Sequence, residues 1–330
     1  MSMSRISIYC LLALLLGAGI AWVTTSISLL AMFTQAVIYA IFALGVGVLL
    51  KQNGLVSFGH ALYFGMAGYG AGIILEMAWM PAEWALLVIL VVIGLSAFLI
   101  GLVIVRVPGI AFGMLTLAMG QMAYLLASRA RGMTGGADGM QIPWPQTLFG
   151  VPQSTILQPG VLFLSAWGVM VVVAYVLVWI LQTRFGAITE AIRDNEERAR
   201  FIGIKTTLPR AGIYAISAVV AGIAGLMSSI NTGFISPESL HWSVSAVTLL
   251  MVVVGGFRRL VGPIVGAIVY FLVKDFLGDH ATHSMAIFGA ILIVVIAFAP
   301  DGITGAIERA LGRRRLDRSS TDSHRKERQA

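Results

Sequence analysis

Long apolar runs separated by short polar stretches fill most of the chain. A helix needs about 20 apolar residues to cross the hydrocarbon core of a bilayer. On that basis the sequence predicts an all-α fold, a polytopic transmembrane bundle over residues 1–305 with a basic, disordered cytoplasmic tail at 306–330. The ten predicted segments are about 6–23, 29–50, 55–75, 84–105, 109–127, 161–181, 211–230, 244–256, 261–277 and 284–300.

The composition agrees with a lipid-facing surface. Hydrophobic residues make up 58% of the chain and charged residues 11%, and the mean hydropathy is +0.91. A soluble domain carries about 25% charged residues. The net charge of +7 comes largely from the 184–210 segment and the 309–328 tail. Such basic clusters mark cytoplasmic segments of membrane proteins, and we expect no nucleic-acid binding.

The basic residues also predict the orientation of the chain in the membrane. If Arg5 is cytoplasmic, then Lys51, Arg106 and the 182–210 loop lie on the same side. Cytoplasmic loops carry an excess of Lys and Arg, so we expect both termini to be cytoplasmic. The exceptions are Arg129 and Arg131.

Two predicted segments are irregular. The 55–75 segment is interrupted by repeated glycines, and the 244–256 segment is short. Each is third in its half of five segments, and an odd number per half inserts the two halves in opposite orientations. This pattern is typical of an inverted 5+5 repeat around a transport path. Two independent sites of close helix packing would explain it equally well.

The glycine-broken segment supplies the candidate residues of a translocation path. Irregular backbone at membrane depth is tolerated where it lines a cavity or is buried in protein. A packed, hydrogen-bonded histidine near a helix end is the competing interpretation for His60. The candidate residues are Ser57, Gly59, His60 and Gly65.

The 182–210 loop predicts one short amphipathic helix, with Gly186 at an entry turn and Gly203 at its end. Asp194–Arg198 and Glu196–Arg200 are spaced as i,i+4 ion pairs. The polar face is nearly balanced in charge, which suits contact with a protein better than contact with lipid. A connector lying at the membrane interface is the alternative. The predicted apolar face contains Ile188, Ala191, Ile192, Ala199 and Ile202.

The sequence contains no P-loop, no HExxH spacing and no GxSxG motif. A phosphate-binding P-loop needs Gly-Lys followed by Ser or Thr, and no lysine here follows a glycine. The pair His280 and His283 suggests either a metal site or a solvated helix end, and we expect no metal. Away from their ends the predicted spans contain almost no ionisable residues, which disfavours an ion-driven carrier. A channel would explain this scarcity but not the amphipathic loop.

Several stretches resemble the LivM-like permease subunits of ATP-binding-cassette importers for branched-chain amino acids. The matching stretches are 54–72, 108–122, 134–140, 184–204 and 234–267. The resemblance implies a non-catalytic subunit in the bacterial inner membrane, without a cofactor of its own. It implies a LivH-like permease partner, two LivG/LivF-like ATPase subunits that bind ATP and Mg, and a periplasmic binding protein. Permeases for urea or short-chain amides are similar enough to remain an alternative.

The resemblance also assigns roles to two loops. The helix at 184–205 would be the coupling helix that docks on the ATPase, with Gly186, Glu190, Ala191, Ile192, Arg193, Asn195 and Gly203 as its characteristic residues. An outer-face loop would contain Thr134, Gly135, Gly136 and Asp138, and a second outer turn Ser236, Pro237 and Glu238. Asp138 would either contact the binding protein or cap a helix.

Overall fold

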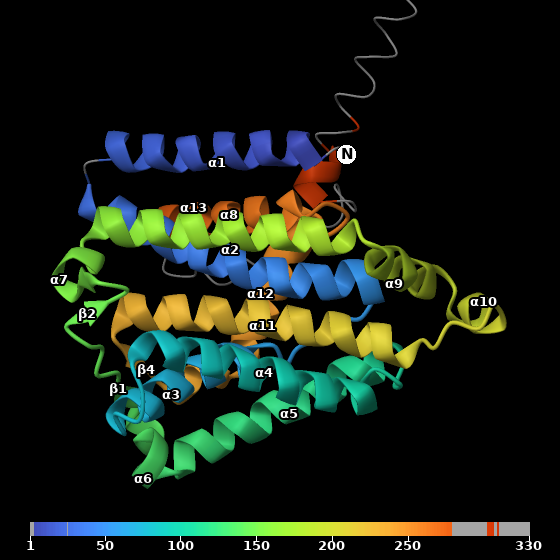
Figure 1. Ribbon diagram of the computed structural model, residues 1–330, viewed down its shortest axis with the longest axis horizontal. Helices are drawn as coiled ribbons and strands as arrows, with labels where there is room; N and C mark the ends of the chain where they lie inside the picture. The colour runs from blue at the N-terminus through green and yellow to red at the C-terminus, as the bar shows by residue number, and fades with distance from the viewer. Residues whose placement is uncertain (1–2, 25, 279–301, 307–308, 310–330) are drawn as a thin grey trace, which may run out of the picture.

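The computed structural model describes residues 3–24, 26–278, 302–306 and 309. These residues form a bundle of long helices that run broadly side by side (Figure 1). The all-α class is confirmed, apart from two short two-stranded ribbons. The main helices are α1 (Met3–Val23), α2 (Ile27–Asn53), α3 (Ala61–Glu76), α4 (Ala82–Ile104), α5 (Gly109–Arg129), α8 (Pro159–Leu181), α9 (Arg184–Asp194), α10 (Glu196–Phe201), α11 (Thr207–Thr232), α12 (Trp242–Gly255) and α13 (Val261–Gly278).

Short elements join the long helices at one end of the bundle. β1 (Met140–Gln141) pairs antiparallel with β4 (Phe234–Ile235), and β2 (Thr147–Leu148) with β3 (Val151–Pro152). Figure 1 places these ribbons at one end, here called the strand end, and α9 and α10 at the opposite end, the α10 end. The remaining short helices are α6 (Arg131–Thr134), η1 (Gly136–Asp138), α7 (Gln153–Ile156) and η2 (Pro237–Leu240).

Five described helices are long and apolar enough to cross a membrane, namely α2, α4, α5, α8 and α11. Shorter apolar helices occur at Cys10–Val23 and Trp242–Gly255. The predicted segment at 284–300 and nearly all of the predicted tail lie outside the described residues. The count of ten spans is therefore not confirmed, although the other predicted segments each coincide with a helix at least in part.

The predicted span at 55–75 is not one continuous helix. α2 ends at Asn53, Gly54 adopts a left-handed conformation with φ of 65°, and α3 begins only at Ala61. At 1.5 Å per residue, the 16 residues of α3 extend about 24 Å and the 14 residues of α12 about 21 Å. Both are shorter than the hydrocarbon core of about 30 Å. The two segments predicted to be irregular thus correspond to the two short helices α3 and α12, each of which follows a stretch of backbone outside the long helices.

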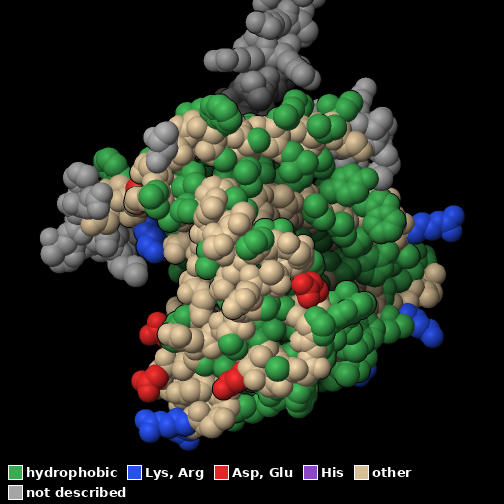
Figure 2. Space-filling model, turned by 60° about the vertical axis from the view of Figure 1, so that its left-hand side comes forward, with side chains coloured by type: hydrophobic (Ala, Val, Ile, Leu, Met, Phe, Trp, Pro, Cys, Tyr) green, Lys and Arg blue, Asp and Glu red, His purple; other side chains and the backbone are tan. Residues whose placement is uncertain are grey.

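The centre of the bundle is formed by α2 and α11, the most buried of the five spans, whereas α4 and α5 are the least buried. Small residues allow the central helices to approach closely. A Cβ atom on Gly225 of α11 would lie 2.0 Å from the Phe64 carbonyl oxygen of α3, so only glycine fits there. On the face shown in Figure 2, hydrophobic side chains cover a large area, and the Lys and Arg side chains lie near its margins.

The contact at Gly225 gives a test of this packing. Gly225→Ala forces apart two backbones, and overpacking of this kind costs about 1–3 kcal/mol. We expect a clear fall in the midpoint of thermal unfolding of the purified protein. Gly168→Ala on α8 is the matched control, since a Cβ atom there meets nothing within 4 Å. Equal midpoints for the two variants would show that α3 and α11 do not pack this tightly.

Candidate functional site

The broken stretch at 54–60 is held by side chains from distant helices. The Phe58 amide donates to Thr116 Oγ1 of α5 at 3.2 Å, and the Ala61 amide donates to Ser245 Oγ of α12 at 2.7 Å. The Gly59 amide donates to Ser57 Oγ at 3.3 Å. Backbone N–H groups freed by a helix break cannot find water inside a bilayer. These hydroxyl groups therefore satisfy the break from within the protein.

His60 is the centre of a buried hydrogen-bond network. Its Nε2 lies 2.7 Å from Ser217 Oγ, and its Nδ1 lies 2.7 Å from Ser57 Oγ. Ser217 Oγ donates its single proton to the Gly45 carbonyl at 2.7 Å. Ser217 must therefore accept from Nε2–H, and because full burial disfavours a charged imidazolium, Nδ1 accepts from the Ser57 hydroxyl. The network assigns the neutral Nε2–H tautomer to His60 and joins the start of α3 to α2 and α11.

This network lies within the membrane span. Ser217 is ten residues from the start of α11 and Gly45 is eight residues from the end of α2, which places them about 15 Å and 12 Å along those helices from the α10 end. Thr116 is about 10 Å along α5 from the same end. The depths measured along these three helices all place the broken stretch well below the membrane surface.

A second broken stretch enters from the strand end. After β4 the chain passes through η2 and begins α12 at Trp242. Leu240 packs so closely on α3 that a Cβ atom on Gly65 would lie 2.5 Å from its side chain, and Ser245 reaches Ala61. One break therefore enters from the α10 end and the other from the strand end, and they meet inside the bundle. An inverted repeat would produce this arrangement, and the repeat itself stays a prediction.

The candidate path residues are brought together at this junction. Ser57 and His60 are fully buried within the chain, and a Cβ atom on Gly59 would lie 2.1 Å from the Thr116 carbonyl oxygen. Gly65 faces Leu240 at the second break. The geometry of His60 fits the alternative of a packed, hydrogen-bonded histidine. A role of these residues in the path stays a prediction.

The sequence predicts one helix in the 182–210 loop, but the structure has two, α9 and α10. Asn195 has φ of −159° and ψ of 101°, which interrupts the helix, and its Oδ1 accepts from the Arg198 amide at 2.8 Å to cap α10. The predicted Asp194–Arg198 pair is wrong, because the break separates them and Asp194 pairs with Arg193 at 2.7 Å.

Of the two glycines predicted to lie at the ends of the helix, only one does so. Gly203 follows α10 with φ of 87°, as predicted for a helix end. Gly186 lies inside the first turn of α9 and not before it. It packs against the end of α8, where a Cβ atom would lie 2.1 Å from the Leu181 carbonyl oxygen. Gly186 thus allows a sharp turn from α8 into α9.

α9 is attached to the end of α2. Thr189 Oγ1 donates to Gln52 Oε1 at 2.8 Å, and Arg193 Nη1 donates to the Lys51 carbonyl at 2.5 Å. A cation is favourable at the C-terminus of a helix, where carbonyl groups lack partners. Arg193 also contacts Glu190 at 3.5 Å. Since α2 leads directly into Gly54, a displacement of α9 acts on the helix that ends at the broken stretch.

α10 is attached to the start of α11 through Glu196. Its carboxylate accepts from Arg210 Nη1 and Arg200 Nη2, each at 2.6 Å, and from Thr206 Oγ1 at 2.9 Å. The predicted Glu196–Arg200 pair is thereby confirmed. Partial burial raises the pKa of the Glu196 carboxyl, but the Thr206 hydroxyl and the two guanidinium groups outweigh it and hold this pKa below its ordinary value. The Glu196 carboxylate thus stays ionised at neutral pH.

The tip of this segment is apolar and exposed. Phe201 is 89% exposed and Ile202 is 73% exposed. The predicted apolar face is confirmed for Ile192 and Ala199, which are buried, and is wrong for Ile202 and for the exposed Ala191. In Figure 1, α10 lies beyond the ends of α2, α8 and α11 along their common direction. The tip therefore projects away from the spans.

At the strand end the two predicted outer loops meet, because β1 follows the first and β4 precedes the second. Thr134 Oγ1 donates to the carbonyls of Ala127 and Ala130, which closes the first loop through the left-handed Gly135 and Gly136. Asp138 is exposed and caps none of the described helices, so the capping interpretation is wrong.

The second loop turns into η2 with Pro237 at its first position, as Ser236-Pro237 predicted. Pro237 is buried, whereas Glu238 is exposed like Asp138. The joined loops thus present two exposed carboxylates.

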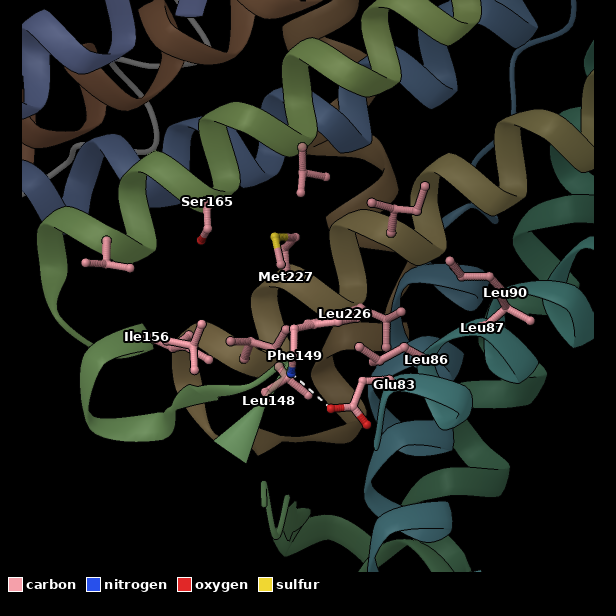
Figure 3. A pocket seen from close by; sticks show the side chains of 15 residues that line it. Glu83, Leu86, Leu87, Leu90, Leu148, Phe149, Ile156, Ser165, Leu226 and Met227 are labelled. Carbon is pink, nitrogen blue, oxygen red and sulfur yellow. Dashed lines mark hydrogen bonds between the residues drawn. The ribbon is translucent and has the colours of Figure 1, made fainter. Parts of the chain in front are cut away.

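An apolar groove of about 560 Å³ lies between α4, α8 and α11 (Figure 3). Figure 2 shows a hollow among hydrophobic side chains on this flank. Its polar lining is limited to Ser165 and Glu83, whose Oε1 accepts from the Phe149 amide at 2.9 Å. None of the described residues that line the groove is a Lys or Arg, so they offer no cationic side chain to a carboxylate. It suits hydrocarbon better than a polar substrate. No group of three metal-ligating side chains occurs among the residues described.

A set of polar side chains beside the junction of the two breaks was not predicted as part of the site. The rings of Tyr124 on α5 and His241 before α12 have centroids 5.1 Å apart, and Gln121 lies one turn from Tyr124. Gln121 is a lone amide in an otherwise apolar span, and His241 directly precedes the shortest predicted segment. These two features were the available signals.

The His60 network predicts the effect of removing one hydroxyl. Ser217→Ala leaves the Nε2–H of His60 and the Gly45 carbonyl without their partner, which costs about 1–3 kcal/mol. We expect a lower midpoint of thermal unfolding. Ser229→Ala is the matched control, because Ser229 is similarly buried on α11 but its hydroxyl bonds to the Leu226 carbonyl of its own helix. A Ser217→Ala protein as stable as the control would contradict the network.

Residues 28–296 match the family described as branched-chain amino acid transport system / permease component. The high-affinity branched-chain amino acid transport system permease proteins LivM of Salmonella typhimurium and Escherichia coli are each 28% identical over 292 residues, covering 82% of this chain and 68% of theirs. The fructose import permease protein FruF of Bifidobacterium longum is 25% identical, covering 81% of this chain and 76% of that protein. No solved structure matches. The chain is a multi-pass membrane protein and belongs to the branched-chain amino acid transport permease family.

Proposed function

We propose that this chain is the permease subunit of an ATP-driven importer of branched-chain amino acids in the bacterial inner membrane. Family membership supports the transport role. The observation that carries the dependence on an external energy source is the α9–α10 segment, which projects from the spans with an exposed apolar tip and is bonded to the end of α2.

In this proposal the chain catalyses no reaction. Two LivG/LivF-like subunits bind ATP and Mg and receive the α10 tip in an apolar groove. When these two subunits close on ATP they displace α9. The hydrogen bonds from α9 to Gln52 and Lys51 then move the end of α2. This displacement is transmitted through Gly54 to the broken stretch, and the movement of that stretch opens or closes the path. A LivH-like permease forms the other side of the translocation path.

The orientation follows from the same docking. The α10 end faces the cytoplasm, as do both termini, and the strand end faces the periplasm. There the exposed carboxylates of Asp138 and Glu238 are available to basic side chains of a periplasmic binding protein. Attraction between exposed charges of opposite sign speeds encounter more than it strengthens the complex.

The rival classes fit less well. A secondary carrier needs buried ionisable groups to couple to protons or ions. No Asp, Glu, Lys or Arg is among the fully buried side chains of the described residues, and both ring nitrogens of the buried His60 are hydrogen-bonded to serines. A channel gives no reason for an exposed apolar tip on a segment bonded to α2. The LivM relatives favour amino acids as the substrate, while the FruF relative is named for fructose. Urea and short-chain amides stay the alternative substrates that the sequence resemblance suggests.

Co-purification tests the docking. The tagged chain is expressed with its companion permease and ATPase subunits, and Phe201→Ser is combined with Ile202→Ser. We expect the ATPase to co-purify with the wild type and to be reduced at least about tenfold with the variant, because burial of large apolar side chains dominates such interfaces.

Trp79→Ser is the control, since Trp79 is 73% exposed between α3 and α4 at the strand end. It should leave the ATPase bound. Failure of the wild type to retain any ATPase, with the chain folded and the second permease bound, would contradict the proposed function. Retention by both variants would exclude the α10 tip as the docking element.

A further inference from the structure

Three polar groups beside the junction of the two breaks lack hydrogen-bond partners among the described residues. The Oε1 atom of Gln121 is buried without a partner. The Tyr124 hydroxyl makes no hydrogen bond, and His241 uses only Nδ1, which accepts from the Ser243 amide and faces the Ser243 hydroxyl at 2.8 Å. The Tyr124 and His241 rings meet edge to face at 73°. All three side chains are half-buried.

These groups lie at membrane depth. Gln121 is twelve residues and Tyr124 fifteen residues beyond the start of α5, or about 18 Å and 22 Å along a helix of about 31 Å. His241 reaches the same depth because it contacts Tyr124. Moving a polar group without a hydrogen-bond partner from water into hydrocarbon costs free energy. The surface formed by Gln121, Tyr124 and His241, here called the polar patch, is therefore unsuited to face lipid.

The polar patch also lies next to both breaks. A Cβ atom on Gly120, beside Gln121, would lie 3.5 Å from Gly59 Cα in the first break and 3.9 Å from the Leu240 carbonyl oxygen in the second. A displacement of either break therefore moves the immediate neighbours of the patch. The fully buried His60 has both ring nitrogens occupied, whereas the patch offers unused donors and acceptors.

We propose that the polar patch lines the translocation path and contacts the moving solute, an inference that rests on the proposed function. An amide, a phenol and an imidazole can hydrogen-bond the ammonium and carboxylate groups of a zwitterion, and none of them is a fixed charge. Trp242, 39% exposed and with its ring 5.7 Å from that of His241, offers an apolar surface to an aliphatic side chain. The patch thus suits zwitterionic amino acids and neutral polar solutes better than ions.

Uptake by the reconstituted complex tests this assignment. The chain is assembled in vesicles with its second permease, the ATPases and the binding protein, and uptake of radiolabelled leucine is measured together with ATP hydrolysis. Gln121→Leu and Tyr124→Phe each remove polar atoms with little change in volume. We expect uptake to fall at least about fivefold, with hydrolysis and assembly unchanged. Tyr175→Phe is the control, since Tyr175 is a half-buried tyrosine on α8, in contact with neither break.

The outcomes separate the two proposals. Normal uptake by both variants would overturn the polar patch and leave the proposed function intact. Loss of the second permease from the purified variants would make the patch a subunit interface and overturn the path assignment. A correctly assembled wild-type complex that takes up no leucine, fructose or urea on addition of ATP would overturn the proposed function itself.

Discussion

Every part of this structure depends on how the backbone between α2 and α3 is satisfied inside a membrane. Residues 54–60 leave the helix at the end of α2, and inside a bilayer their amide groups would have no water to bond to. Hydroxyl groups from α5 and α12 accept from Phe58 and Ala61, while His60 connects the break to α11 through Ser217. Because these partners come from three different helices, the break can exist only in the assembled bundle. The same requirement fixes where α11 and α12 lie.

The break also connects the two ends of the molecule. On one side it continues α2, whose last turn is bonded to α9 through Gln52 and Lys51. On the other side it meets the stretch that descends from the ribbon of β1 and β4. Force applied at the α10 tip can therefore reach the outer loops through backbone and a few hydrogen bonds. Packed networks with two discrete arrangements are what long-range coupling in proteins requires.

Much of the architecture could be predicted from the sequence, because apolar runs report membrane spans directly. The glycines at 54–72 also located the break, although they could not show that the helix begins only at Ala61. Its partners Thr116 and Ser245 are 58 and 184 residues away from the groups they bind, so no local pattern identifies them. The 182–210 loop was mispredicted as one helix because Asn195 caps a new helix through its own side chain, a choice that helical periodicity does not report. Ile202 has the right spacing for a buried face, but the turn at Gly203 leaves it exposed.

The central claim is that ATP-driven motion reaches the path through the contact between α9 and α2. Thr189→Val tests it most directly, because it keeps the shape of the side chain and removes the hydroxyl whose one bond to α2 is to Gln52, its other acceptors being the Gly186 and Phe185 carbonyls of α9 itself. In the reconstituted complex, leucine uptake and ATP hydrolysis would be measured on the same vesicles. Uptake per ATP hydrolysed should fall several-fold while the complex stays assembled and hydrolysis continues. An unchanged ratio of uptake to hydrolysis would contradict transmission through α2.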